Sequence, residues 1–299
     1  MRLLLAKIID NLANIKWDLV FYYKYIFQIK FRRIINKNKH FKNSQINERC
    51  FIVGNGPSLN KLDLTKLNKE IVFTVNEIIS NSSIYENLNS DFHILIDPYY
   101  FNLSSELPED IATIERLKRI NYTNKKPICI TSYEGKNAFE KNGLDKILDL
   151  YYVFQHRYIT ESYKSTIKMD RNMPSSLNVI QAAIFSAMYM GFKKIYLIGC
   201  DMTFIFLSIE SNIEGNNNKL KNFHAYKYSE NQIKSIKAFC SKRDNEFNLY
   251  ELAKTFSIFK RIKKYADKHH IEIVNATAGG ALDVFDRIKF ESLFYDSEK

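Results

Sequence analysis

A glycine-containing turn is the part of this sequence whose residue types most clearly suggest chemistry. The apolar segment Cys50–Val53 runs directly into Gly54–Ser58, which is Gly-Asn-Gly-Pro-Ser. Glycine allows positive φ and a close approach of the backbone to a ligand, and proline stiffens the turn. The serine is suited to cap a following helix whose free amide groups favour a phosphate, although a turn that binds nothing would have the same pattern. We expect nucleotide contacts from Gly54, Asn55, Gly56 and Ser58.

Polar residues also follow several other apolar, strand-like segments. In an open parallel sheet, ligands bind beyond the carboxyl ends of the strands, so residues at these positions are candidates for one site. Asn and Asp can bind base edges and ribose hydroxyls as well as phosphate groups, although each residue alone is more commonly a turn or cap residue. The strand-end candidates are Asn76, Asp97, Asp201, Asn275 and Thr277.

Residues 204–248 differ in composition from the rest of the chain and predict a lid near the ligand edge of the sheet. The segment has Glu-Gly-Asn-Asn-Asn at 214–218, an aromatic cluster at 223–228 and few long apolar runs. Long irregular insertions at such an edge commonly close over a substrate. His224 is the candidate general base, because a neutral imidazole accepts a proton near neutral pH; a surface histidine without a role fits the sequence equally well.

The sequence motifs predict neither a metal ion nor a resident cofactor. Gly-Lys-Ser/Thr, His-Glu-X-X-His and Asp-X-Asp are absent, and the four cysteines show no Cys-X-X-Cys spacing. We therefore interpret the cysteines as small core residues in a reducing compartment. A magnesium ion held by Asp97 and Asp201 is the alternative that the residue types allow.

Short apolar segments alternate with helical patterns from Cys50 onward. Amphipathic patterns predict helices at 177–190 and 250–269. Strands separated by helices form mostly parallel sheets, so we predict a Rossmann-like α/β fold with a mostly parallel sheet flanked by helices. The six predicted strands are Cys50–Val53, Ile71–Val75, Phe92–Ile96, Pro127–Thr131, Lys194–Ile198 and Ile271–Val274.

The basic charge of the chain lies in its first 46 residues. The whole chain carries +11; residues 1–46 contain ten Lys or Arg and two Asp, or +8, which leaves +3 for the rest. Charges interrupt residues 1–35, so no apolar run approaches the roughly 20 residues needed to span a bilayer. Apolar residues recur at three- and four-residue steps from Trp17 to Phe31 and predict an amphipathic helical leader. Its basic and aromatic side chains would either lie on an anionic membrane surface or pack on the main domain.

These patterns predict two parts of the chain. Residues 1–46 form the leader and membrane-surface anchor, and residues 47–299 form the nucleotide-binding α/β domain with a lid at about 204–248. The nearly neutral main body argues against a nucleic-acid partner. We expect a cytoplasmic protein that is peripheral at the inner face of the membrane, and formation of a homo-oligomer stays open.

Four stretches of the sequence resemble the bacterial sialyltransferases of glycosyltransferase family 42. Enzymes of that family transfer a sugar from a CMP-activated donor without a metal ion. The resemblance implies that Asn55 and Asn76 contact the donor and that Ser175 or Ser176 lies near its phosphate. It also implies that His224 deprotonates the acceptor hydroxyl. The stretches are residues 52–59, 73–76, 96–98 and 190–201.

The sequence departs from that family at two places. Asp97 stands where the family has an asparagine near the nucleotide. The family has a tyrosine that assists the leaving phosphate soon after the Gly-X-Asp turn, and here residues 202–204 are Met-Thr-Phe. Tyr226 or Tyr228 would then supply the hydroxyl, and we expect Tyr226 to join His224 as a catalytic residue.

A second resemblance covers residues 50–295, to the domain family named for the archaeal 6-hydroxymethylpterin diphosphokinase, the MptE-like group. Pro174–Val179, Leu197–Asp201 and Asn275–Phe285 carry it. Many bacterial members of that group accompany surface-polysaccharide or flagellin-glycosylation proteins. The glycine turn is shared by both families and does not separate them, whereas Asn-Ala-Thr-Ala-Gly-Gly, which begins at Asn275, favours the MptE-like group.

Together these features predict an enzyme, a glycosyltransferase that moves a sialic acid-like or other acidic sugar from a CMP-activated donor to a surface or lipid-linked glycan. Transfer would proceed with inversion and without a metal ion. One alternative is an ATP- and magnesium-dependent diphosphokinase that acts on a pterin-like alcohol. The other is a non-catalytic scaffold at the membrane surface. The expected partners are the nucleotide-sugar donor, the glycan acceptor and an anionic membrane.

Overall fold

The computed structural model describes residues 2–120, 125–159, 167–203, 206, 220, 222–228, 230–240 and 244–298. The pattern of contacts between Cα atoms divides the chain into two compact units. Unit 1 comprises residues 1–48 and 90–193, and unit 2 comprises residues 49–89 and 194–299. Each unit is an α/β structure built on parallel strands.

Unit 1 contains four parallel strands in the spatial order β6-β5-β4-β3. Every residue of β3 is buried, and so are the last four residues of β4, as expected for parallel strands that are covered on both faces. The register between β5 and β6 shifts between Gln155 and Arg157. The strands are β3 (Phe92–Leu95), β4 (Ile128–Ser132), β5 (Asp149–Arg157) and β6 (Asn172–Pro174).

Helix α6 (Val179–Met190) is buried within unit 1 and packs next to β3. Asn178 caps its start, because its side-chain oxygen accepts from the Ile180 amide at 2.8 Å, and Gly191 ends it with a left-handed φ of 95°. All side chains from Ile180 to Met190 are buried, so the helix needs apolar residues on every face. The other described helices of unit 1, apart from the two long leader helices, are α4 (Pro108–Arg119), α5 (Lys136–Lys141) and 3₁₀ segments at Lys37–Phe41, Pro98–Asn102, Tyr133–Gly135 and Leu144–Lys146.

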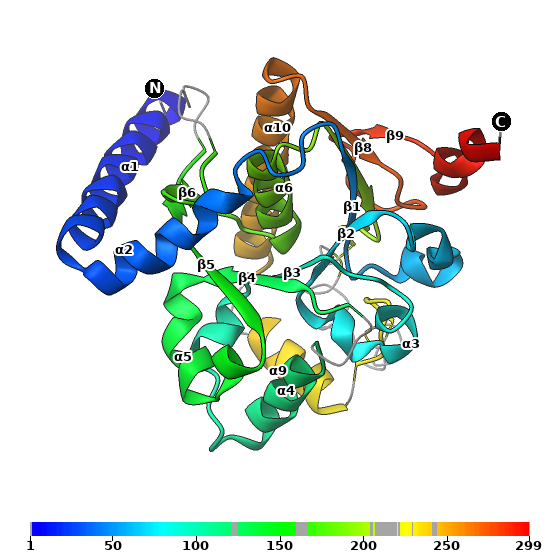
Figure 1. The fold of residues 1–299 in the computed structure, drawn as a ribbon, viewed down its shortest axis with the longest axis horizontal. Coiled ribbons are helices and arrows are strands. Elements are labelled where there is room, and N and C mark those ends of the chain that lie inside the picture. The colour runs from blue at the N-terminus through cyan, green and yellow to red at the C-terminus, as the bar shows by residue number, and fades with distance from the viewer. Residues whose placement is uncertain are drawn as a thin grey trace. The chain divides into compact units, whose positions relative to one another are not determined.

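The leader forms two helices of unit 1, α1 (Arg2–Phe27) and α2 (Ile29–Asn36). Gln28 between them has an extended backbone, and the chain turns there (Figure 1). Both helices pack on β5, so the leader packs on the body, which is one of the two alternatives that its sequence allows. None of the helices in the described ranges combines the length and apolar character needed to cross a membrane. The buried cluster between leader and strand consists of Phe21, Phe31, Ile35 and Phe154.

Unit 2 contains five parallel strands in the order β2-β1-β7-β8-β9. The last four residues of β1, β2 and β7 are buried and form the core of the unit. Val53 of β1 pairs with Thr74 of β2 and with Ile198 of β7, so the residues after these strands lie at one edge. The strands are β1 (Arg49–Val53), β2 (Ile71–Val75), β7 (Lys194–Ile198), β8 (Glu272–Asn275) and β9 (Asp286–Arg287).

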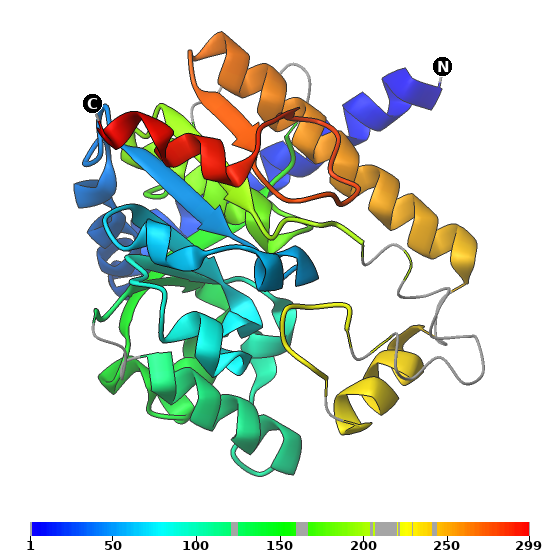
Figure 2. The ribbon, with the colours of Figure 1, turned by 90° about the vertical axis from the view of Figure 1, so that its right-hand side faces the viewer.

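Helix α10 (Asn245–Lys268) packs along β8 in unit 2 (Figure 2). Asp244 caps its start by accepting from the Phe247 amide at 2.7 Å. Its buried residues recur at three-, four- and seven-residue steps and form one apolar face, from Leu252 to Ala266. The other described helices of unit 2 are α3 (Ser82–Tyr85), α9 (Glu230–Cys240) and 3₁₀ segments at Pro57–Lys61, Leu64–Leu67, Asn76–Ser80 and Phe290–Glu298.

The predicted fold class, a Rossmann-like α/β fold with a mostly parallel sheet flanked by helices, is confirmed. All six predicted strands and both predicted helices are present, although α10 begins at Asn245 rather than Tyr250. Strands β5, β6 and β9 are additional to the prediction. Part of the predicted lid, including residues 207–219, lies outside the described residues. The division of the chain between residues 46 and 47 stays a prediction.

Candidate active site

The turn after β1 packs directly against the turn after β7. The Gly54 amide donates to the Ile198 carbonyl and the Gly56 amide to the Gly199 carbonyl, both at 2.8 Å. A Cβ atom at Gly54 would lie 2.4 Å from the Gly199 oxygen, and one at Gly56 would lie 1.7 Å from Oδ2 of Asp201. The left-handed φ is found at Gly199 (62°), while Gly56 has φ −69°. The first two glycines are therefore required because other parts of unit 2 approach them closely, and not by a left-handed turn.

Ser58 binds Asp201 instead of capping a helix. Gly56 occupies the N-cap position of the following 3₁₀ segment, so the predicted capping role of Ser58 is wrong. The Ser58 hydroxyl donates to Oδ2 of Asp201 at 2.7 Å, and its amide donates to Oδ1 at 3.3 Å. Both side chains are buried; burial raises the pKa of the Asp201 carboxyl, and the hydrogen bonds from Ser58 act in the opposite direction. Asp201 therefore positions the turn after β1.

Asn275 and Thr277 hold the loop that follows β8. Asn275 donates from Nδ2 to the Leu282 carbonyl at 2.9 Å and accepts at Oδ1 from the Thr277 amide at 3.0 Å. The Thr277 hydroxyl accepts from the Cys200 amide at 3.0 Å. Both side chains are buried, so their polar groups connect the ends of β7 and β8. A contact of either residue with a nucleotide stays a prediction.

Asn55 and Asn76, which follow β1 and β2, each have a buried side-chain oxygen without a partner. Within the ranges that the structure describes, neither Oδ1 atom has a hydrogen-bond donor in reach. An unpaired buried acceptor costs roughly 1–3 kcal/mol and marks a position where a ligand or ordered water supplies the donor. Asn76 also has a left-handed φ of 41°, which asparagine tolerates better than most residues. These strand ends therefore offer acceptor atoms to N–H or O–H groups of a ligand.

Residues 222–228 bring His224 to this edge of unit 2. The Ala225 amide donates to the Asn55 carbonyl at 2.7 Å. The Ala225 carbonyl accepts from Nδ2 of Asn81 at 2.8 Å and from Nδ2 of Asn60 at 3.3 Å. The backbone at Ala225 is thus fixed on both sides, and the adjacent His224 lies beside the turn that follows β1.

Tyr228 is the tyrosine that is hydrogen-bonded to His224. Its hydroxyl oxygen lies 2.8 Å from Nδ1 of His224, whereas Tyr226 makes ring contacts, with its centroid 5.1 Å from that of His224. Burial lowers the pKa of His224 to about 4 and raises the pKa of Tyr228 to about 12. Both groups are therefore uncharged at neutral pH. The hydroxyl contact with His224 comes from Tyr228, which is also hydrogen-bonded to Tyr226, and the catalytic role expected for Tyr226 stays a prediction.

The remaining sequence-predicted residues lie at strand ends of unit 1. Asp97 follows β3, is exposed, and accepts at Oδ1 from the Tyr99 amide at 3.0 Å. Ser175 and Ser176 follow β6 and are half-buried, and the Ser175 amide donates to the Arg157 carbonyl at 2.7 Å. The structure therefore brings the predicted residues of unit 2 together at one edge, and it places these three residues at strand ends of unit 1.

Three of the four cysteines have the core positions that the sequence predicts, and the side chain of Cys240 lies outside the described residues. Cys50, Cys129 and Cys200 are free and buried, and burial raises the pKa of each thiol. In the described part of the chain, no group of three or more His, Cys, Asp or Glu side chains is arranged to hold a metal ion.

Three residues that organise this edge are additional to the sequence prediction. Asn60 and Asn81 bind the Ala225 carbonyl across 165 and 144 residues of sequence, respectively. Arg287 of β9 donates to the carbonyls of Thr277, Gly279, Gly280 and Leu282 at 2.5–3.3 Å. No local pattern indicates such partners, because each contact joins residues whose proximity depends on the complete fold.

Comparison with known proteins gives one family and a set of solved structures. A family model described as 6-hydroxymethylpterin diphosphokinase MptE-like matches residues 22–205. The sialyltransferase CstII from Campylobacter jejuni in complex with the substrate analogue CMP-3FNeuAc is 15% identical, with 81% of this chain and 86% of that chain covered and a TM-score of 0.40. A structure of the sialyltransferase CST-II with trisaccharide acceptor and CMP has the same identity and coverage, with a TM-score of 0.41. No curated protein sequence matches the chain.

Proposed function

The chain belongs to the 6-hydroxymethylpterin diphosphokinase MptE-like family, and within that family we propose that it is a glycosyltransferase using a CMP-activated sugar. The observation that carries the proposal is the hydrogen bond between the Ala225 amide and the Asn55 carbonyl. It fixes His224, an imidazole that burial keeps uncharged, beside strand ends with unpaired acceptor oxygens. An uncharged base next to a polar site for a nucleoside suits the transfer of a sugar to a hydroxyl group.

Recognition of the donor would depend on the strand-end residues of unit 2. Oδ1 of Asn55 and of Asn76 lacks a donor within the described ranges, and the cytosine amino group and ribose hydroxyls supply such donors. Amide groups of the Gly54–Ser58 turn would hold the donor phosphate as negative charge develops on it. A contact of Ser175 or Ser176 with the donor stays a prediction. Asp201 would support this site indirectly, by holding Ser58.

In the proposed reaction, His224 takes a proton from the acceptor hydroxyl. The Tyr228 oxygen lies 2.8 Å from Nδ1 of His224. In the tautomer that the reaction requires, Nδ1–H donates to this oxygen, and Nε2 is unprotonated and able to act as the base. The acceptor oxygen attacks the anomeric carbon as its proton moves to Nε2. The bond between that carbon and the phosphate oxygen breaks, CMP leaves with the bonding electron pair, and the anomeric configuration is inverted. No metal ion takes part in these steps.

The partners and the location belong to the same proposal. The acceptor is a surface or lipid-linked glycan, and the donor carries a sialic acid-like or other acidic sugar. The reaction takes place in the cytoplasm, at the inner face of the membrane where a lipid-linked acceptor is exposed. Nucleic acid is not a partner in this proposal.

A second candidate function is an ATP- and magnesium-dependent diphosphokinase acting on a pterin-like alcohol, which the description of the family favours. The residues for magnesium would be Asp97 and Asp201, and they do not fit this role. Both Asp201 oxygens already accept hydrogen bonds from Ser58, and Oδ1 of Asp97 accepts one from the Tyr99 amide. We therefore derive no catalytic step through a magnesium ion.

Titration of the full chain with nucleotides separates these functions. Melting temperatures are measured with CMP, UDP, GDP and ATP, each with and without magnesium, because a ligand that binds the folded state raises the melting temperature. We expect stabilisation by CMP that is the same with and without magnesium. Stabilisation by ATP that requires magnesium would support the diphosphokinase instead, and no response to any nucleotide would support a non-catalytic scaffold.

A further inference from the structure

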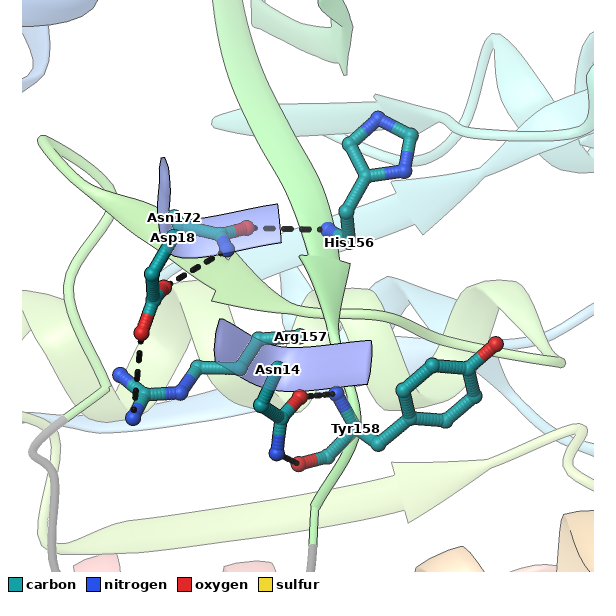
Figure 3. Close-up of polar contacts among 6 residues, drawn as sticks. All are labelled: Asn14, Asp18, His156, Arg157, Tyr158 and Asn172. Atoms are coloured by element: carbon teal, nitrogen blue, oxygen red, sulfur yellow. Dashed lines mark hydrogen bonds and ion pairs between the residues drawn. The ribbon is translucent and has the colours of Figure 1, made fainter. Parts of the chain in front are cut away.

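One face of helix α1, which we call the inner face, is bound to the rest of unit 1. Asn14 donates from Nδ2 to the Tyr158 carbonyl at 3.0 Å and accepts at Oδ1 from the Tyr158 amide at 2.6 Å (Figure 3). One turn further, Asp18 accepts from Nδ2 of Asn172 at 2.9 Å and pairs with Arg157 at 3.5 Å (Figure 3). These residues, together with Trp17 and Phe21 from the same face, hold α1 against β5 and β6.

Trp17 reports directly on this inner face. Its ring stacks on the His156 imidazole, with centroids 4.0 Å apart and planes inclined by 16°. It is the single tryptophan of the chain. Any movement of α1 away from β5 would break this stacking and change the environment of Trp17.

The opposite face of α1 is apolar and exposed. At 100° per residue, Leu12, Leu19 and Ile26 lie on the side of the helix that faces away from Asn14 and Phe21. The exposed fractions of the large apolar side chains on this outer face range from 51% to 70%. We define the outer face as Leu12, Ile15, Leu19, Tyr22, Tyr23, Ile26 and Phe27.

The charges next to the outer face are positive. Lys16 is exposed on α1, and Lys30, Arg32 and Arg33 are exposed on α2, which follows directly. Between residues 11 and 47 the sequence contains one acidic residue, Asp18, and that residue is paired on the inner face. An exposed apolar and aromatic face with basic residues beside it has the chemistry of a helix that lies in an anionic lipid interface.

We propose that the outer face of α1 docks on an anionic lipid bilayer while the inner face stays bound to unit 1. Tyr22, Tyr23 and Phe27 would enter the interfacial region, and the basic residues of α2 would bind lipid headgroups. A second copy of the chain is a poorer occupant, because pairing two such faces brings like charges together. The docking deepens the membrane location given under the proposed function, but it uses other residues than the transfer reaction, so lipid binding and nucleotide binding can fail separately.

Flotation of the full chain with lipid vesicles tests the docking. The vesicles are phosphatidylcholine alone, or phosphatidylcholine with about 30% phosphatidylglycerol. We expect binding to the anionic vesicles that weakens by about tenfold or more when NaCl is raised from roughly 0.1 to 0.5 M, because salt screens the headgroup charge.

Two double variants distinguish the contribution of apolar insertion into the bilayer from that of attraction between basic residues and anionic headgroups. Leu19→Ser/Ile26→Ser removes apolar side chains from the outer face, and Arg32→Gln/Arg33→Gln removes charge; each is expected to weaken binding at least about tenfold. The matched controls are Leu249→Ser/Tyr250→Ser and Lys260→Gln/Lys264→Gln on α10, whose side chains are also exposed and which are expected to bind as the unchanged chain does. Circular dichroism and melting temperatures verify that all four variants fold.

The fluorescence of Trp17 distinguishes docking by the outer face from release of the helix. We expect its emission to stay unchanged on anionic vesicles, because the inner face remains on β5. In the background Trp17→Phe, a Tyr23→Trp reporter on the outer face should shift to shorter wavelength on the same vesicles. Three results would each overturn the proposal: no vesicle binding by the folded chain, equal binding by the outer-face variant, or self-association through this face without vesicle binding.

Discussion

Asparagine has opposite roles on the inner face of the leader and at the strand-end edge of unit 2, which is the edge formed by the residues that follow β1, β2 and β7. In the leader, both polar atoms of the Asn14 side chain are paired with the Tyr158 backbone. At the strand ends, Asn55 and Asn76 each keep a buried oxygen that has no donor within the described ranges. A paired buried amide stabilises the fold, whereas an unpaired one costs free energy that a ligand can recover. This difference in pairing distinguishes an asparagine that holds the fold together from one that is available to a ligand.

Asn38 has an unpaired buried oxygen but a structural role. Its Oδ1 is also buried and unpaired within the described ranges, but its Nδ2 donates to the carbonyls of Tyr152 and Met169 at 2.8 and 2.9 Å. The position of Asn38 is thus explained by what its amide nitrogen holds. Asn55 and Asn76 differ because they follow the ends of parallel strands, and the Asn55 carbonyl binds the segment that carries His224.

Removal of the proposed base, His224, is expected to have the largest effect. His224→Ala should lower the rate of transfer by about 10³-fold, within the range of general-base catalysis, and change CMP affinity by less than about twofold. Release of CMP from a CMP-sugar, together with calorimetric titration of CMP, provides the two measurements.

The matched control for the base is His270→Asn. His270 is exposed with a left-handed φ of 54°, a conformation that asparagine accepts, so this variant should transfer at the original rate. A His224→Ala variant that retains transfer would place the base elsewhere. One that loses CMP binding as well would make His224 a structural residue.

Asn14→Ala tests the paired asparagine of the leader, whose side chain binds the Tyr158 backbone. The substitution leaves the Tyr158 amide and carbonyl without partners, so we expect a loss of about 2 kcal/mol in the free energy of unfolding and no change in CMP affinity. Denaturant unfolding measures the loss, and Asn11→Ala, an exposed position on the same helix, is the control. Equal stabilities of the two variants would show that the polar contacts of the inner face do not hold the leader.

Asn55→Ala tests the unpaired oxygens at the strand ends, and we expect it to change ligand affinity instead of stability. It removes one acceptor for the ligand, so CMP should bind about tenfold more weakly, while stability stays the same or rises slightly. The control is Asn38→Ala, which should destabilise the fold and leave CMP affinity unchanged. If Asn55→Ala destabilised the protein and Asn38→Ala weakened CMP binding, the reasoning from unpaired oxygens would be wrong.

The elements that the sequence predicted well are those whose signal is local. Three or four consecutive apolar residues shortly before a polar turn identify β1, β2 and β7, since these strands are buried on both faces. Strands β6 and β9 have three and two residues, too few for any periodicity. Strand β5 begins and ends with polar or charged residues, because its last residues meet the leader and β6.

The candidate site was predictable in its residue types and not in its contacts. The glycine turn and the residue after each strand follow from the general position of ligands on parallel sheets. The bond between Ser58 and Asp201 spans 143 residues, and the local sequence around Ser58 instead favours a helix cap. Tyr228 lies four residues after His224, yet nothing in that spacing distinguishes it from Tyr226 until the backbone at Ala225 is fixed.

The smallest expected effect is that of pH on the rate of transfer, and it tests whether burial lowers the pKa of His224. Burial lowers the pKa of His224 to about 4, so the imidazole is the free base at any pH well above that value. The rate should therefore be constant from about pH 8 to 5 and fall only as pH approaches about 4, whereas an exposed histidine would lose activity near its ordinary pKa of about 6.5.

Stability gives an independent readout of the same shift. The unfolded chain binds the proton on this histidine below about pH 6.5, while the folded chain binds it only near pH 4, so the free energy of unfolding should decrease as pH falls through that window. His224→Gln removes this contribution, and the difference between the unfolding curves of the two proteins at pH 7 and pH 5 isolates it. A rate that falls near pH 6.5, with no such difference in stability, would mean that His224 is solvated and that the strand-end edge is no more specialised than the surface around it.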